Sequence, residues 1–110
     1  MDCIFCKIAA GEIPSKKLYE DDAVLAFADI EPKAPVHVLV IPKRHLPSAA
    51  AVTAETAGVV GHIYTVIAAL CAENGWHSYR VVTNVGPDAG QTVPHLHFHI
   101  LAGRALGEMG

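Results

Sequence analysis

Residues 94–101, PHLHFHIL, place a histidine at every second position with an apolar residue between each pair. Successive side chains of a β-strand point to opposite faces, so this alternation predicts a strand over residues 95–101. One face of that strand would pack against a helix, and the other would carry a row of imidazoles. The apolar side chains are Leu96, Phe98 and Ile100, and the imidazoles are His95, His97 and His99.

The order of elements along the chain predicts an α+β fold. Residues 2–14 favour a short helical turn ended by glycine and proline. From Thr53 to Gly75, apolar residues recur at steps of three and four, which is typical of a helix laid on a sheet. Hairpin-like connections at both ends of the chain favour an antiparallel sheet covered by this helix on one face. The expected strands are residues 16–20, 23–29, 36–42, 78–85 and 95–101.

Length and charge limit the classes of function. A chain of 110 residues is long enough for one compact domain, residues 1–110, and 52% apolar content argues against intrinsic disorder. The net charge of -3 gives none of the basic character that a nucleic-acid polymer requires, although one local pocket can take a small phosphorylated ligand. A domain of this size leaves much of its surface exposed, which favours pairing with a second copy.

The N-terminus and the cysteines indicate a cytoplasmic protein. No signal-peptide pattern begins the sequence, and no apolar run reaches the length that spans a membrane. The three cysteines are an odd number, and Cys3 and Cys6 form a CxxC pair, which favours reduced thiols or a metal over a disulfide framework. A lone CxxC also fits two half-buried thiols at the start of a helix, so both interpretations stay open.

Three explanations account for a row of imidazoles on one strand face. An exposed face must be polar, yet Ser, Thr, Lys or Glu would serve as well, and all three positions are histidine. A metal site is the second explanation. With a rise of about 3.3 Å per residue, His95 and His99 start roughly 13 Å apart, whereas Zn–N bonds are about 2 Å. Two of these histidines could share an ion, but all three could not readily do so.

The third explanation is nucleophilic catalysis at phosphorus. A neutral imidazole attacks through one ring nitrogen while the other keeps its proton against an acceptor. The central His97 would attack, and the flanking His95 and His99 would orient it and meet the charged oxygens or the leaving group.

The connector directly upstream of the histidines suits a phosphate group. Gly86 and Gly90 allow close backbone approach, and three side chains there can donate hydrogen bonds to oxyanions. These donors are Asn84, Gln91 and Thr92. Glycine is common in connectors, so the loop alone is weak evidence for a phosphate site, and the adjacent histidines make that evidence stronger.

These motifs resemble the histidine triad (HIT) family, and specifically its branch of nucleotide-binding proteins that act as nucleoside phosphoramidases. HLHFHIL fits the family signature, AGQTVPHLHFH at residues 89–99 fits its longer form, and residues 20–46 look like an earlier block of the family. The resemblance implies a HIT-like fold with a five-stranded antiparallel sheet, one long helix and one short helix. It also implies a two-fold homodimer with the long helix at the interface.

The resemblance assigns roles to individual residues. His97 would be the nucleophile that forms a covalent nucleotidyl-histidine, which water then hydrolyses without a catalytic metal. His99 would contact the phosphate near the scissile bond, and His37 would complete the polar network. The substrates would be purine nucleoside 5′-phosphoramidates or related AMP conjugates. Asp29 would accept hydrogen bonds from the ribose hydroxyls. The base would lie against Ile4, Phe5, Ile8, Phe27 and Ile30, and the phosphate against Asn84, Gly90, Gln91, Thr92 and Val93.

For the cysteines, the resemblance to bacterial relatives with a CIFC start implies a structural zinc. The implied ligands are Cys3, Cys6, His45 and His95. Two other functions stay open: a dinucleoside polyphosphate hydrolase, and a non-catalytic nucleotide-binding or zinc-stabilised interaction protein.

Overall fold

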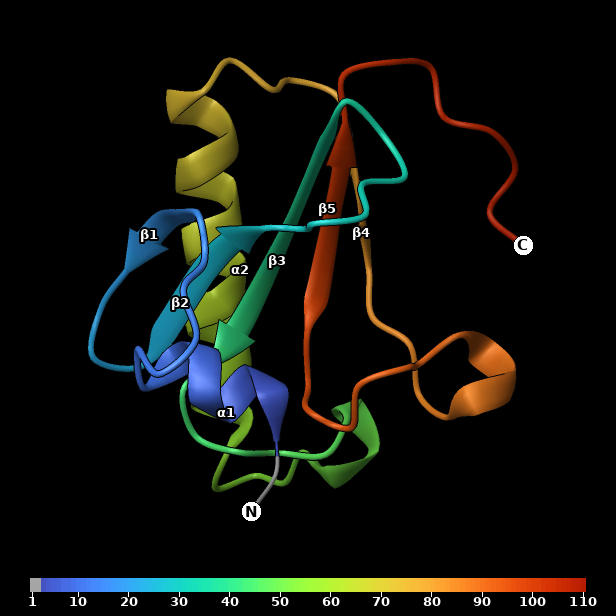
Figure 1. Ribbon diagram of the computed structural model, residues 1–110. Coiled ribbons are helices and arrows are strands. Elements are labelled where there is room, and N and C mark those ends of the chain that lie inside the picture. The colour runs from blue at the N-terminus through green and yellow to red at the C-terminus, as the bar shows by residue number, and fades with distance from the viewer. Residues whose placement is uncertain (1–2) are drawn as a thin grey trace.

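The computed structural model describes residues 3–110, so Asp2, at the start of the expected helical turn, lies outside the described residues. The chain forms a five-stranded antiparallel sheet with the strand order β1-β2-β3-β5-β4, together with one short and one long helix (Figure 1). This confirms the predicted α+β fold. The elements are α1 (Ile4–Ala9), β1 (Lys17–Glu20), β2 (Val24–Ala28), β3 (Val36–Pro42), α2 (Ala57–Glu73), β4 (Tyr79–Val82) and β5 (Phe98–Ala102), with 3-10 turns at Ala49–Ala51 and Pro87–Ala89.

The two helices lie on opposite faces of the sheet because alternate residues of the central strands point to opposite sides (Figure 1). The side chains that pack with α2 are Val24, Ala26, Val38, Val40, Phe98 and Ile100. Those that pack with α1 are Leu25, Phe27, Leu39 and Ile41. Because both faces of β2 and β3 are covered, these strands are apolar almost throughout.

The long helix α2 follows the predicted apolar stripe. Its buried residues are Ile63, Val66, Ile67, Leu70 and Cys71, and the partly buried Val59 and Val60 pack against the same cluster. The helix ends before Gly75, whose φ of 72° is a left-handed conformation that favours glycine. Within residues 3–110, no helix combines the length and the apolarity needed to cross a membrane.

The last strand is shorter than predicted, because β5 begins at Phe98 rather than at residue 95. The Leu96 amide donates to the Leu46 carbonyl, and the His97 carbonyl accepts from the Thr83 hydroxyl, so both backbone groups bond outside the sheet. The alternation nevertheless persists: Leu96 packs in the α2-side cluster, whereas His97 and His99 face the opposite side. His95 does not join an open row, because its side chain is fully buried.

Candidate active site and metal centre

A cavity of about 890 Å³ opens on the α1 side of the sheet. Helix α1 and strand β2 supply apolar walls, and β3, β5 and the loop after β4 supply polar groups. Most of the predicted site residues meet here. They are Ile4, Phe5, Ile8, Phe27, Asp29, Ile30, His37, Asn84, Gly90, Thr92, Val93, His97 and His99.

Among the residues predicted for catalysis and substrate binding, two lie outside the lining, Gln91 and His95. The Gln91 amide braces the loop: its Oε1 accepts from the Gly86 amide at 2.9 Å, and its Nε2 donates to the carbonyls of Pro47 and Val93. The Gln91 side chain therefore holds the loop of residues 86–93 in shape from outside the cavity lining. The His95 ring faces the cysteines, and His95 meets the cavity-lining residues His97 and Phe5 through its backbone carbonyl and through a T-shaped ring contact, respectively.

Leu39 and Leu101 also line the cavity, although the sequence motifs did not predict them. In the antiparallel register Leu39 lies opposite His99, and Leu101 lies opposite His37. Directly opposite residues share one face of the sheet, so the period of two that marks the histidines also marks these two leucines.

The His97 ring has a defined orientation. Its Nδ1 lies 2.7 Å from the backbone carbonyl oxygen of His95. A carbonyl oxygen only accepts, so Nδ1–H donates and, in the neutral ring, Nε2 keeps its lone pair. The His97 residue is 5% exposed and lines the cavity. This is the arrangement in which an imidazole acts as a nucleophile through Nε2.

A second hydrogen-bonded chain fixes the proton on His99. The Lys33 amide donates to His37 Nδ1 at 3.0 Å, so the His37 proton lies on Nε2, 2.8 Å from His99 Nδ1. His99 Nδ1 accepts this bond, which leaves the His99 proton on Nε2. His99 therefore keeps an N–H donor on a ring that lines the cavity.

Burial keeps both of these histidines neutral. Burial lowers the pKa of His37, against the opposing charge of Asp29, whose Oδ2 lies 3.3 Å from His37 Nε2. Burial also lowers the pKa of His99 to about 4, helped by the neighbouring His97 and His37 rings. At neutral pH both rings are uncharged, so His37 and His99 can hydrogen-bond to each other without repulsion between two imidazolium charges.

We expect the low pKa of His99 to destabilise the fold in mild acid. The His99 ring takes up its proton near the ordinary pKa of 6.5 in the unfolded chain and only near 4 in the folded protein. Between these values the unfolded state binds more protons, so the free energy of unfolding falls as the pH decreases from 6.5 to 4. When urea titrations are repeated at several pH values in this window, the free energy of unfolding of His99→Gln should change less steeply with pH than that of the parent. Parallel curves of unfolding free energy against pH for His99→Gln and the parent would contradict the assignment.

Two groups of potential metal ligands occur among the described residues, and their chemistry differs. Asp29, His37 and His99 bring ligand atoms within 4.8 Å of one another. However, the Lys33 amide occupies the Nδ1 lone pair of His37, so the His37 nitrogen that faces the group carries a proton. A protonated ring nitrogen cannot ligate a cation. We therefore interpret this group as a hydrogen-bonded cluster.

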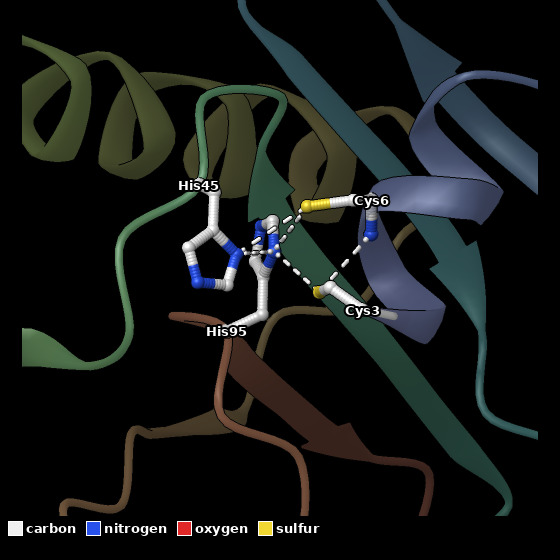
Figure 2. A group of neighbouring side chains, drawn as sticks. All are labelled: Cys3, Cys6, His45 and His95. Atoms are coloured by element: carbon white, nitrogen blue, oxygen red, sulfur yellow. Dashed lines mark hydrogen bonds between the residues drawn. The ribbon is translucent and has the colours of Figure 1, made fainter. Parts of the chain in front are cut away.

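The other group, Cys3, Cys6, His45 and His95, fits a tetrahedral cation (Figure 2). His95 Nδ1 lies 3.3 Å from Cys3 Sγ and 3.5 Å from Cys6 Sγ, and His45 Nδ1 lies 3.3 Å from Cys6 Sγ and 3.2 Å from His95 Nδ1. Bonds of about 2.3 Å to sulfur and 2.0 Å to nitrogen place tetrahedral ligands roughly 3.3–3.8 Å apart. These four pairs of donor atoms have about this spacing, and all four donors lie within 4.8 Å of one another.

The surroundings of His95 support the same interpretation. His95 Nε2 lies 2.9 Å from the Pro42 carbonyl oxygen, so this nitrogen carries the proton and Nδ1 presents its lone pair to the cluster. A hydrogen bond from the outer nitrogen to a carbonyl is the usual support of a metal-ligating histidine. Burial, with the neighbouring Cys3, raises the pKa of the Cys6 thiol, so a cation that binds there would displace a proton.

Comparisons with known proteins agree with this geometry. Residues 10–106 match the family model described as HIT domain. A purine nucleoside phosphoramidase of Escherichia coli (strain K12) is 43% identical over 110 residues, covering 98% of this chain and 92% of that protein. A solved histidine triad protein from Clostridium difficile has a TM-score of 0.96 at 52% identity and covers 100% of this chain and 97% of that one. A HIT family hydrolase from Clostridium thermocellum has a TM-score of 0.94 at 42% identity, with 98% and 96% covered. The chain therefore belongs to the HIT domain family.

Proposed function

We propose that the protein is a hydrolase that cleaves purine nucleoside 5′-phosphoramidates or related AMP conjugates. The observation that carries the proposal is the hydrogen bond from His97 Nδ1 to the His95 carbonyl oxygen, at the edge of a cavity large enough for a nucleotide. Support also comes from the Escherichia coli relative, which is named a purine nucleoside phosphoramidase, and from the Clostridium thermocellum structure, which is named a hydrolase.

The chemistry proceeds in two displacements. His97 Nε2 attacks the α-phosphorus, a bond from phosphorus to the ring nitrogen forms, and the bond from phosphorus to the leaving amine breaks as the amine takes up a proton from solvent, which the attacking water returns to solvent in the second step. Water then attacks the nucleotidyl-histidine, releasing AMP and returning the lone pair to Nε2. His99 Nε2–H donates to a phosphoryl oxygen, where negative charge develops.

The cavity offers matching surfaces for the rest of the substrate. Apolar side chains from α1 and β2 accommodate the base: Ile4, Phe5, Ile8, Phe27 and Ile30. The Asp29 carboxylate accepts from the ribose hydroxyls, while its Oδ1 is held by the Glu31 amide at 2.8 Å. Asn84, Thr92, the Val93 amide and the backbone at Gly90 bind the phosphate, and Gln91 holds their loop in shape.

The Cys3, Cys6, His45 and His95 cluster binds a structural zinc, since two thiolates and two imidazoles in tetrahedral order are a donor set of such sites. Zinc there supplies no chemistry to the phosphate and joins separate parts of the chain. The proposal also includes a cytoplasmic location, where cysteines stay reduced. It further includes a homodimer, for which the half-exposed Tyr64 and Tyr79 offer surface.

The test is turnover of adenosine 5′-phosphoramidate by the purified protein, followed as release of AMP. We expect efficient turnover of this substrate and much slower cleavage of diadenosine polyphosphates. Faster cleavage of the dinucleotides would favour the polyphosphate hydrolase alternative. AMP binding without turnover of either substrate would favour a nucleotide-binding module.

A further inference from the structure

The metal cluster draws its ligands from three segments that also build the cavity. Cys3 and Cys6 lie at the start of α1, His45 follows β3, and His95 precedes β5 (Figure 2). Helix α1 has only six residues, so it is too short to persist without its packing and cross-links. The same helix carries Phe5, which is a wall of the cavity. A cation at the cluster would therefore fix that wall.

His95 belongs to both sites at once. Its ring Nδ1 faces the cysteine sulfurs, its Nε2–H donates to Pro42, and its backbone carbonyl accepts from His97 Nδ1 at 2.7 Å. The His95 residue is 0% exposed, so its ring cannot shift without displacing its neighbours. A shift of the His95 ring at the metal cluster would therefore also move the His95 carbonyl, which orients the His97 ring.

The Phe5 ring forms a second link. Its centroid lies 5.9 Å from the His95 ring and 5.1 Å from the His97 ring, and it meets both edge to face. The Phe5 residue is 7% exposed. Phe27 also meets Phe5, at 5.6 Å, and lines the same cavity, but no ring contact joins Phe27 to His95 or His97 among the described residues.

From these contacts we propose that metal binding at the Cys3, Cys6, His45 and His95 cluster and nucleotide binding in the cavity are coupled through the His95 backbone and the Phe5 ring. The inference rests on the proposed nucleotide binding. Each ligand raises the affinity for the other by the same factor, because coupling between two sites is reciprocal. We expect a factor on the order of tenfold, within the range typical of coupled sites.

The experiment uses AMP and Zn²⁺ as probes and measures the effect of each on the binding of the other. The AMP dissociation constant is measured by calorimetry on zinc-loaded and zinc-free protein. The Zn²⁺ dissociation constant is measured by competition with a chelator, with and without saturating AMP. The factor by which Zn²⁺ changes the AMP dissociation constant should equal the factor by which AMP changes the Zn²⁺ dissociation constant. In Co²⁺-loaded protein, the visible absorption of the tetrahedral ion should change when AMP binds.

Two variants identify the path and keep the test valid if the zinc-free protein does not fold. Phe5→Leu keeps all four metal ligands and should bring the ratio of Zn²⁺ affinities with and without AMP closer to one than in the parent, because only the path through the His95 backbone remains. Phe27→Leu should weaken AMP binding and leave that ratio at the parent value.

Three outcomes would overturn the inference. If zinc-loaded protein does not bind AMP, the proposed function fails and the coupling fails with it. If AMP binds but leaves the Zn²⁺ affinity unchanged, the coupling alone fails. If Phe27→Leu changes the ratio as much as Phe5→Leu does, the path through Phe5 is wrong.

Discussion

Replacing His97 with alanine is expected to lower the turnover of adenosine 5′-phosphoramidate by at least about a thousandfold, because removal of an activated nucleophile leaves only binding and electrostatic stabilisation. Within the described part of the chain, neither of the two flanking imidazoles, His95 and His99, is in an equivalent state. His99 Nδ1 is occupied by His37, and the His95 ring faces the cysteines. The measurement is kcat/KM from AMP release.

The control is His77→Ala, because His77 is exposed and lies outside the cavity lining. It should keep the parent kcat/KM. Circular dichroism and AMP affinity show whether His97→Ala stays folded and still binds nucleotide. A folded variant that binds AMP and retains parent turnover would contradict the role of His97.

The second large effect is expected from loss of the metal. Parent protein purified without added metal should contain about one zinc per chain, and Cys3→Ser should contain much less. Cys3 also caps α1, since its sulfur accepts from the Cys6 amide at 3.3 Å. We expect Cys3→Ser to lower the free energy of unfolding by several kcal/mol, roughly in line with binding energies that are part of folding energy. Metal analysis and urea titration measure the two effects.

Cys71→Ala is the matched control, because Cys71 is buried in the α2 cluster and lies outside the metal-ligand group. It should lose about 1 kcal/mol through a small packing defect and keep its zinc. A chelator should then destabilise the parent and Cys71→Ala but not Cys3→Ser. Parent protein with no metal, and equal stability with and without chelator, would count against the metal centre.

The period of two in residues 95–101 predicts which face each side chain takes, and it does so correctly for Leu96, Phe98, His97 and His99. It does not show where the strand begins. That boundary depends on partners distant in sequence. The Leu46 carbonyl accepts a hydrogen bond from the Leu96 amide, and the Pro42 carbonyl accepts one from the His95 ring. Backbone pairing of this kind leaves no local pattern in the sequence.

The same limit applies to individual site residues. The Gln91 side chain can donate hydrogen bonds to a phosphate, yet its amide is already hydrogen-bonded to the Gly86 amide and the Pro47 carbonyl. The Lys33 contribution comes from its backbone N–H, which is common to every residue but proline. The alternation of the histidines follows from residue type and spacing, and the apolar walls follow from the resemblance to the family, whereas the assignment of each ring proton requires the three-dimensional contacts.

The most direct test of the central claim is to locate the covalent intermediate. The protein is mixed with adenosine 5′-phosphoramidate, stopped within one turnover in alkaline denaturant, which preserves a bond between phosphorus and imidazole nitrogen, and analysed by peptide mass spectrometry. We predict a single adenylyl group on His97 that disappears as AMP forms. An adenylyl group on another residue, or turnover in which no adduct accumulates even when the hydrolysis step is slowed, would contradict the claim.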